Sequence, residues 1–317
     1  MKLSIVIPCY NEEKNVEIIH NTIVKMLYNK KISYEMIFVN DGSKDNTILE
    51  LKKLVEKDEA NIKVVNFSRN FGKEAAMYAG LKESSGDYVT IIDADMQQNP
   101  SLVLKMLGIL ENDPSFDSVA AYQEVRKEGK VLSAFKRMFY KLINKISEVE
   151  FVNGASDFRM FRRNMVDAIL SMQEYYRFSK GIFSWVGFNT YYMPYQVSER
   201  ANGTSKWSFW KLFKYAIDGI VSFTTTPLRI ATILGLLISF GSFIYFIIVI
   251  VQTFICGIDV PGYASLIGIA LLLGGIQLLS LGIIGEYLAR TYIENKKRPI
   301  YIAKEVITTK NKKNKVN

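Results

Sequence analysis

The stretch Gly86-Asp87-Tyr88-Val89-Thr90-Ile91-Ile92-Asp93-Ala94-Asp95 (residues 86–95) decides the fold, because an apolar, strand-like run ends here in two carboxylates one residue apart. A strand that ends in this way presents hard oxygen ligands at the open edge of a sheet. Such ligands suit Mg²⁺ or Mn²⁺ held against a diphosphate. A single Asp-x-Asp pair is also common on loops and helix caps, so its meaning depends on the segments around it.

Short apolar runs alternate with helical segments throughout the amino-terminal part of the chain. We expect strands at residues 2–8, 35–40, 62–67 and 87–93. Helices are expected at residues 12–28 and 72–83, and a further helical segment follows residues 41–43 and ends at about residue 57. This alternation is typical of βαβ units, and it predicts an α/β fold with a parallel sheet. Ligands of such sheets bind beyond the carboxyl ends of the strands. The polar motifs follow the strands, so the site is expected there.

Composition divides the chain into a soluble part and an apolar part. The chain has 317 residues, 49% of them hydrophobic, and a net charge of +9, of which residues 290–317 carry +7. Because this basic tail directly follows an apolar span, a membrane surface is a better partner for it than nucleic acid. Two cysteines, Cys9 and Cys256, and one histidine, His20, cannot build a disulfide framework, a zinc site or a histidine-based triad.

Two uncharged stretches, Ile230–Ile255 and Tyr263–Ile284, each exceed the roughly 20 residues that cross a bilayer. Arg229 precedes them, Arg290 follows them, and the link between them has no Lys or Arg, which predicts a hairpin with both outer flanks in the cytosol. The apolar start of the chain is too short for a signal peptide, so the large domain is expected in the cytosol. Glycines in the second stretch either allow close packing, within the hairpin or in a homo-oligomer, or are ordinary membrane glycines.

Two further segments have an amphipathic character. Residues 131–147 combine an apolar stripe with a basic opposite face, which fits either a helix on an anionic bilayer or a core helix with a solvated face. Residues 205–220 place Trp207, Trp210 and Tyr215 beside lysines, a combination that favours the membrane interface.

Seven strings together resemble the family 2 glycosyltransferases. They are VIPCYNEE (6–13), VNDGSKDNT (39–47), FSRNFGKEAAMYAGL (67–81), GDYVTIIDADMQ (86–97), GASDFRMFRR (154–163), KGIFSWVGF (180–188) and RANGTSKW (200–207). The resemblance is closest to the polyprenyl-phosphate branch, which contains bactoprenol glucosyltransferases, aminoarabinose transferases and dolichyl-phosphate mannose synthases. It covers nearly the whole chain, including GEYLART at residues 285–291.

The resemblance implies a GT-A-type, Rossmann-like nucleotide-sugar domain followed by a two-helix transmembrane hairpin. The expected parts are a cytosolic catalytic domain at residues 1–204, a juxtamembrane amphipathic helix at 205–225, the two spans at 226–289 and a basic cytosolic tail at 290–317. A string of the Gln-x-x-Arg-Trp type, which marks processive synthases of the family, does not occur in the sequence. A single sugar transfer per encounter is therefore expected.

The resemblance also implies which residues bind the donor. Pro8, Tyr10 and Glu12 match the family's nucleotide-binding strand end, where an apolar wall faces the base and a carboxylate accepts ribose hydroxyls. Asp41 matches a base- or ribose-binding acid, although capping of a nearby helix is an alternative role. Asp93 belongs both to this donor set and to the metal site, which it shares with Asp95 and Gln97. A divalent cation there would stabilise the charge on the leaving nucleoside diphosphate.

The expected acceptor is a lipid monophosphate, whose second pKa of about 6 makes it a competent nucleophile at neutral pH. Two phosphate groups repel one another by on the order of 4 kcal/mol per charge pair at 4 Å and an effective dielectric of 20, so cations must converge on the site. Arg126, Arg137, Arg200 and Lys206 are the candidates, with snorkelling surface cations as the alternative. Asp157 matches the family's third acidic position and is expected, with Asp95, to act in catalysis by orienting the acceptor phosphate or the sugar.

Together these features predict transfer of one sugar from UDP-glucose or UDP-N-acetylglucosamine to undecaprenyl phosphate on the cytosolic face of a bacterial inner membrane. The resemblance implies that the transfer inverts the anomeric carbon. Mg²⁺ or Mn²⁺ is the expected cofactor, and nucleic acid is not an expected partner. Two alternatives stay open from sequence: a GDP-mannose-dependent polyprenyl-phosphate mannosyltransferase, and a non-catalytic membrane scaffold that keeps the fold.

Overall fold

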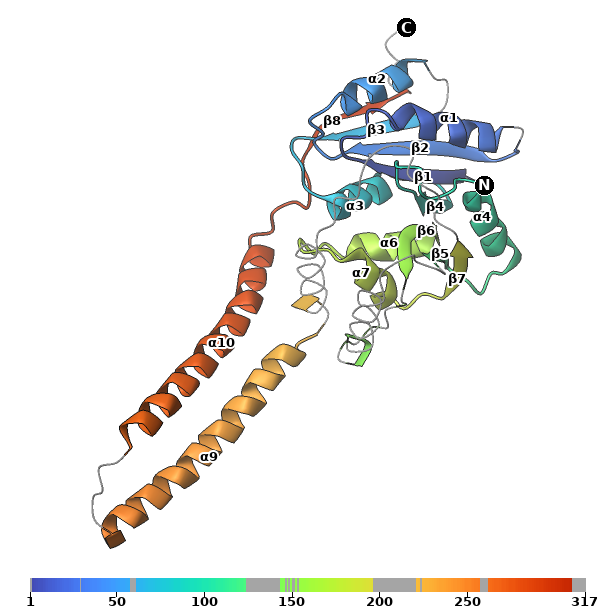
Figure 1. Ribbon diagram of the computed structural model, residues 1–317. Helices are drawn as coiled ribbons and strands as arrows, with labels where there is room; N and C mark the ends of the chain where they lie inside the picture. The colour runs from blue at the N-terminus through green and yellow to red at the C-terminus, as the bar shows by residue number, and fades with distance from the viewer. Residues whose placement is uncertain are drawn as a thin grey trace. The chain divides into compact units, whose positions relative to one another are not determined.

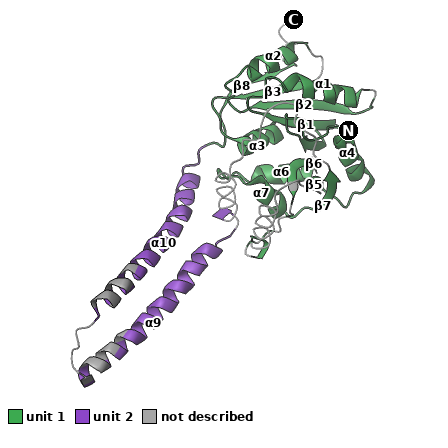
Figure 2. Ribbon diagram, in the orientation of Figure 1, with its two compact units in different colours: residues 1–216, 299–317 green, residues 217–298 purple. Residues whose placement is uncertain are grey.

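The computed structural model describes residues 2–28, 30–57, 61–123, 143–145, 147, 149, 152, 154–195, 221–222, 224–256 and 262–309. The chain divides into two compact units, one formed by residues 1–216 and 299–317 and the other by residues 217–298 (Figure 2). The first unit holds the sheet, and the second holds two long helices.

The amino-terminal half of the sheet is parallel, and the α/β prediction is confirmed. The strands are β1 (Lys2–Cys9), β2 (Ser33–Asn40), β3 (Ile62–Phe67) and β4 (Tyr88–Ile91), with helices α1 (Val16–Leu27), α2 (Thr47–Lys57), α3 (Lys73–Glu83) and α4 (Leu102–Asn112) (Figure 1). These strands lie in the order β4-β1-β2-β3, and each neighbouring pair is parallel. Their carboxyl ends therefore meet at one edge of the sheet.

The other half of the sheet is mixed. It contains β5 (Ser118–Gln123), β6 (Ala155–Arg162) and β7 (Thr190–Tyr195), with helices α6 (Arg163–Ser171) and α7 (Ser179–Trp185). Strand β6 pairs antiparallel with β4, and Ile91 lies opposite Arg159. Because β6 runs in the opposite direction, its first residues lie beside the carboxyl end of β4.

The opposite edge of the sheet comes from the far end of the chain. Strand β8 (Ala303–Thr308) pairs antiparallel with β3, which completes the order β7-β5-β6-β4-β1-β2-β3-β8. This arrangement differs from the separate basic tail expected at residues 290–317, because α10 (Tyr263–Asn295) extends beyond residue 290 and β8 belongs to the sheet. The other predicted domain boundaries remain predictions.

The two faces of the sheet are covered by different helices. Leu3 and Ile5 of β1 pack in one core with residues of α1, α2 and α4, while Val6 points to the other face. There α3 lies so close to β1 that a Cβ on Gly80 would be 2.1 Å from Cγ1 of Val6. Each fully buried aliphatic side chain of this kind stabilises the fold by about 1.5–3 kcal/mol.

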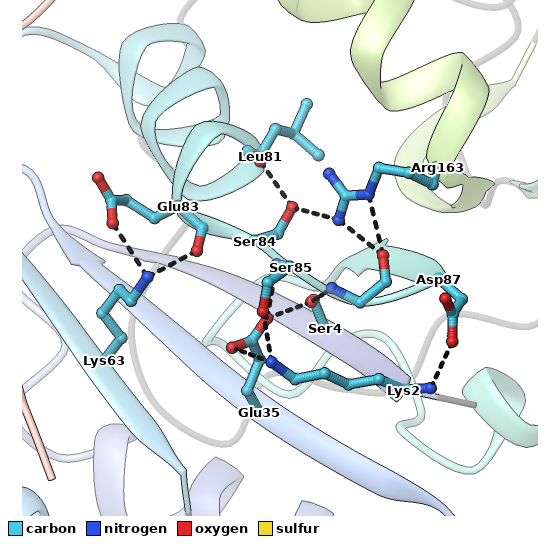
Figure 3. A network of polar contacts seen from close by, with 11 residues as sticks. Lys2, Ser4, Glu35, Lys63, Leu81, Glu83, Ser84, Ser85, Asp87 and Arg163 are labelled. Carbon is cyan, nitrogen blue, oxygen red and sulfur yellow. Dashed lines mark hydrogen bonds and ion pairs between the residues drawn. The ribbon is translucent and has the colours of Figure 1, made fainter. Parts of the chain in front are cut away.

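A polar network ties the strands together at their amino ends, opposite the predicted site (Figure 3). The carboxylate of Glu35 accepts hydrogen bonds from the hydroxyl of Ser4 at 2.6 Å and the backbone N–H of Ser85 at 2.7 Å, and it pairs with the ammonium of Lys2 at 2.9 Å. Burial alone would raise the pKa of Glu35, but these donors lower it to about 2. The network positions β1, β2 and the approach to β4.

The second unit consists of α9 (Thr226–Cys256) and α10, and each helix contains a stretch long and apolar enough to cross a membrane, at Thr226–Tyr245 and Leu272–Asn295. Large apolar side chains along them are exposed, for example Leu236 at 66% and Phe240 at 67%. The predicted pair of apolar helices is confirmed, with longer bounds than the sequence indicated. The amphipathic segment at 205–220, and most of the one at 131–147, lie outside the described residues.

Candidate active site

The predicted site residues that the structure describes lie at the edge where β1, β2 and β4 end and β6 begins. Pro8, Tyr10 and Glu12 lie at the end of β1 and on the loop that follows it, and all three are partly exposed. The backbone N–H of Asn11 in this loop donates to Oγ of Ser43 at 2.9 Å. The two loops that follow β1 and β2 are therefore bound to one another.

Local geometry fixes the orientation of this first loop. Asn11 has a φ of 56°, a left-handed conformation that Asn tolerates better than most residues. Its side-chain Oδ1 accepts from the backbone N–H of Lys44 at 2.8 Å. Glu12 accepts from the amide of Asn15 at 2.6 Å, and its own backbone N–H donates to Thr47 at 2.8 Å. The loop is thus held by several contacts before any ligand binds.

Asp41 is buried and caps a helix, but not the helix that follows it directly. Its Oδ1 accepts from the backbone N–H of Phe71 at 2.6 Å and its Oδ2 from that of Gly72 at 3.0 Å, at the start of α3. The first turn of α2 is bound instead by Asp45, which accepts from the N–H of Thr47 at 3.1 Å. Burial raises the pKa of Asp41, and the backbone donors offset part of that rise. A role in ribose or base binding remains a proposal.

Gly42, directly after Asp41, explains the close approach of these loops. Its φ is +58°, and a Cβ at this position would lie 2.3 Å from the backbone carbon of Arg69. Only glycine avoids both the backbone strain and this clash.

Asp93 is held on both sides by protein groups. Its Oδ1 lies 2.7 Å from Nζ of Lys73, and its Oδ2 accepts from the amide of Gln98 at 2.9 Å. The backbone N–H of Asp93 donates back to Oε1 of Gln98 at 2.9 Å. Gln98 is buried and was not among the predicted residues, although its position just after the carboxylates could have indicated it.

The turn after β4 presents Asp95 and Gln97. Met96 adopts a φ of 62°, and the backbone N–H of Gln97 donates to Oδ1 of Asp95 at 3.1 Å. This turn follows Asp93 directly, so both carboxylates of the Asp-x-Asp motif belong to the same edge of the sheet.

Asp157 joins this group because β6 is antiparallel to β4. Its Oδ2 lies 3.0 Å from Nζ of Lys73, so one ammonium group bridges Asp157 and Asp93. Burial alone would raise the pKa of Asp157, but Lys73 and then Lys180 lower it to about 2. Burial lowers the pKa of Lys73, and the two carboxylates more than reverse this. At neutral pH the ammonium of Lys73 and the carboxylate of Asp157 are therefore both charged.

Lys73 and its neighbour Glu74 were also missed by the sequence analysis, although both lie in the string at residues 67–81. A charged residue in the first turn of a helix at the carboxyl edge was the available signal. Glu74 accepts from the hydroxyl and the backbone N–H of Ser179. Burial and the charge of Asp157 raise the pKa of Glu74 to about 7.

The carboxylates fit a cation shared with a ligand better than a closed protein metal centre. Among the described residues, no group of three or more His, Cys, Asp or Glu side chains could hold a metal ion. Both oxygens of Asp93 have protein partners, but a carboxylate has about four lone-pair sites in all. Diphosphate oxygens and water would have to complete the coordination sphere of Mg²⁺ or Mn²⁺.

The four cations predicted for the acceptor, Arg126, Arg137, Arg200 and Lys206, lie outside the described residues. Their roles remain predictions.

Comparison with known proteins covers both parts of the chain. Residues 4–170 match glycosyl transferase family 2, and residues 226–291 match the GtrB C-terminal hairpin. The chain is 46% identical to CsbB of Bacillus subtilis (strain 168), with 96% of this chain and 91% of that protein covered. It is 42% identical to the prophage bactoprenol glucosyl transferase homolog of Escherichia coli (strain K12), with 96% and 99% covered.

One solved structure to which the chain is similar comes from another bacterium. Glucosyl-3-phosphoglycerate synthase from Mycobacterium tuberculosis, in complex with Mn²⁺, UDP and glucosyl-3-phosphoglycerate, has 18% sequence identity, a TM-score of 0.48, and coverage of 69% of this chain and 77% of that chain. The family match and the relatives show that the protein is an enzyme, so the alternative of a non-catalytic scaffold is set aside. The predicted acidic residues that the structure describes also lie at one edge of the sheet. The chain belongs to glycosyl transferase family 2, in the bactoprenol glucosyl transferase-like branch that carries the GtrB C-terminal hairpin.

Proposed function

We propose that the enzyme transfers one sugar from a UDP-sugar to undecaprenyl phosphate, with inversion, at the cytosolic face of a bacterial inner membrane. UDP-glucose is the favoured donor because several relatives are named as bactoprenol glucosyl transferases. UDP-N-acetylglucosamine is the second donor to test. The observation that carries the proposal is the convergence of Asp93 and Asp157 on Lys73 at the carboxyl edge of the sheet.

Binding of the donor is assigned to the loops after β1 and β2. Pro8 and Tyr10 offer apolar surface to the base, and the carboxylate of Glu12, already oriented by Asn15, can accept a ribose hydroxyl. Because these loops are bound to each other, this part of the site is preorganised, which reduces the entropy lost on binding.

The diphosphate is assigned to the turn after β4. Asp95 and Asp93, with Gln97, are the residues that would hold Mg²⁺ or Mn²⁺ there, and the charge of that ion would offset the charge on the departing nucleoside diphosphate. The ammonium of Lys73 lies 2.7 Å from Asp93 and supplies a second positive charge at the same place. Its two carboxylate partners hold it in position.

The acceptor phosphate needs orientation more than it needs a base. Its second pKa of about 6 leaves it largely dianionic at neutral pH, so it can attack the anomeric carbon directly. Asp157 stays ionised, with a pKa of about 2, and is therefore a poor proton acceptor. We assign it to holding Lys73 and orienting the sugar or the acceptor, with Arg126, Arg137, Arg200 and Lys206 offsetting the acceptor charge.

The two apolar helices of the hairpin support a proposed membrane arrangement. Helices α9 and α10 cross the bilayer and leave the catalytic domain and the carboxyl terminus in the cytosol, where nucleotide sugars are found. The link at 256–262, which lacks Lys and Arg, lies on the outer side.

The test is to incubate the purified full-length protein with a panel of labelled nucleotide sugars and undecaprenyl phosphate, and to identify the glycolipid by mass. The expected product is a hexosyl undecaprenyl phosphate formed from UDP-glucose. A product formed only from GDP-mannose would replace this donor assignment, and the absence of any glycolipid would refute the proposed reaction.

A further inference from the structure

The strand that follows the membrane hairpin contributes a carboxylate to the nucleotide end of the sheet. Glu305 of β8 lies opposite Asn66 of β3 in the strand register. Its Oε1 accepts from the side-chain amide of Asn66 at 2.9 Å and pairs with Nζ of Lys52 at 2.9 Å. Lys52 is the main cause of the lowered pKa of Glu305, so this group is an ionised acceptor at neutral pH.

From Asn66 a line of side-chain hydrogen bonds continues to the loop after β1. Oδ1 of Asn66 accepts from the amide of Asn40 at 2.8 Å, and Oδ1 of Asn40 accepts from the hydroxyl of Ser43 at 2.5 Å. Oγ of Ser43 accepts from the backbone N–H of Asn11 at 2.9 Å. Both asparagines in the middle are buried, so water does not readily replace these contacts.

The directions of the bonds in this line are fixed at both of its ends, by the ionised Glu305, which only accepts, and by the backbone N–H groups of Asn11 and Ser43, which only donate. An ionised carboxylate only accepts, so Asn66 must present its NH₂ group to Glu305 and its oxygen to Asn40. Asn40 then presents its oxygen to Ser43, whose hydroxyl hydrogen is used there and whose oxygen lone pairs face Asn11. Without an acceptor at position 305, the buried amide of Asn66 would lack a partner or would reverse. A reversed Asn66 would turn its NH₂ group toward the NH₂ group of Asn40, whose oxygen is held by Ser43, so the contact between Asn40 and Ser43 would be weakened.

We propose that Glu305 is a positioning residue for the donor site, through which the post-hairpin strand orients the loop that carries Tyr10 and Glu12. The inference rests on the proposed function, because that function assigns this loop to the nucleotide. The line from Glu305 to the loop runs through Asn66, Asn40 and Ser43.

Strand β8 stays attached without this carboxylate, which makes the proposal testable. Backbone hydrogen bonds pair β8 with β3, and the N–H of Ser68 donates to the carbonyl of Ile302 at 2.9 Å. The ring of Tyr301 stacks on Phe67 with 4.9 Å between centroids. Substitution of Glu305 leaves these contacts in place.

The experiment uses the full-length protein in lipid nanodiscs and three variants. Glu305→Met removes the acceptor, Glu305→Gln keeps an acceptor oxygen without the charge, and Lys52→Met removes the ion pair but leaves the line intact. Amide hydrogen exchange is measured over residues 9–14 and 62–67, and UDP affinity is measured by calorimetry with Mg²⁺. These two readouts separate the geometry of the loop from its use by the nucleotide.

Glu305→Met is expected to speed exchange at residues 9–14 and to weaken UDP binding by about tenfold. Glu305→Gln and Lys52→Met are expected to stay within about twofold of the wild type. Unchanged exchange at residues 9–14 in Glu305→Met, or faster exchange there with unchanged UDP affinity, would overturn the inference. Faster exchange spreading over residues 62–67 would also overturn it, since Glu305 would then only secure the edge strand.

Failure of the proposed function gives a different result. If the wild type bound GDP and not UDP, the donor assignment would fall, while exchange at residues 9–14 together with GDP affinity would still decide the role of Glu305.

Discussion

The ammonium group of Lys73 lies 3.0 Å from the carboxylate of Asp157 and joins the start of α3 to the start of β6. The same group lies 2.7 Å from Asp93, at the end of β4. Three elements from separate parts of the chain thus share one cation at the carboxyl edge of the parallel strands. Removal of that cation would leave two carboxylates facing each other, and one of them would be pushed toward protonation.

Lys73→Met is therefore expected to lower the rate of sugar transfer by about 10²-fold, a typical effect for one lost charge-stabilising donor in an active site. Lys82→Met is the matched control, because Lys82 is an exposed lysine on the same helix. Initial rates with UDP-glucose and undecaprenyl phosphate check the prediction. Equal rates for the Lys73 variant and the control would show that the bridge serves the fold alone.

Loss of the Asp-x-Asp carboxylates should remove the metal requirement together with the activity. Asp95→Ala, alone or with Asp93→Ala, is expected to abolish the stimulation of UDP binding by Mg²⁺ or Mn²⁺, and a chelator should have the same effect on the wild type. Calorimetric UDP titrations with and without metal measure this. Wild-type transfer that continues at full rate in a chelator would contradict a metal-dependent reaction.

Asp157→Asn separates orientation of the reacting groups from binding of the donor. The variant keeps the side-chain shape and loses the charge that holds Lys73, so kcat is expected to fall by about 10²-fold while UDP affinity changes less. Steady-state kinetics, with UDP affinity measured separately, check this split. Near-wild-type turnover would remove Asp157 from the mechanism.

The Glu35 network predicts how stability responds to acid. The pKa of Glu35 is about 2 in the folded protein, below its ordinary value of 4.5, so its stabilising contribution is present above pH 4.5 and is lost as the pH falls toward 2. A shift of this size corresponds to about 3 kcal/mol. Thermal unfolding of the wild type and of Glu35→Ala should differ most near pH 7 and converge toward pH 2. Glu56→Gln, at an exposed position on α2, is the control.

The sequence predicted the parallel half of the sheet and the edge that carries Asp93 and Asp95, because both follow from local periodicity and from the geometry of parallel strands. The sequence predicted less about the residues whose positions depend on pairing between strands that are distant in the chain. Asp157 was placed in the site by resemblance, and the antiparallel register of β6 against β4 supplies its physical reason.

The contacts that sequence analysis missed join residues that are far apart in the sequence, and no local sequence pattern indicates that such residues lie close in space. Lys73 lies at the start of an ordinary crossover helix, and only the fold brings it between two carboxylates. Strand β8 was hidden by the basic character of the tail, although Val306-Ile307-Thr308 is a β-branched run typical of a strand. Asn66 and Glu305 meet only because this strand returns to the sheet edge.

Glu74 predicts a stability effect of the opposite sign to that of Glu35. Its pKa is raised from 4.5 to about 7 by burial and by the charge of Asp157, so the neutral form is favoured in the folded protein. The stability that this provides is present below pH 4.5 and is lost as the pH rises through 7.

Glu74→Gln keeps an oxygen for the two donors of Ser179 and removes the buried charge. At pH 8 the variant should therefore unfold at a higher temperature than the wild type, with a gain in the free energy of unfolding of less than about 2 kcal/mol after solvent screening. At pH 5 it should show no gain. Glu56→Gln, an exposed position on α2, serves as the control. A gain of the same size at both pH values would mean that better packing, and not the removed charge, stabilises the variant.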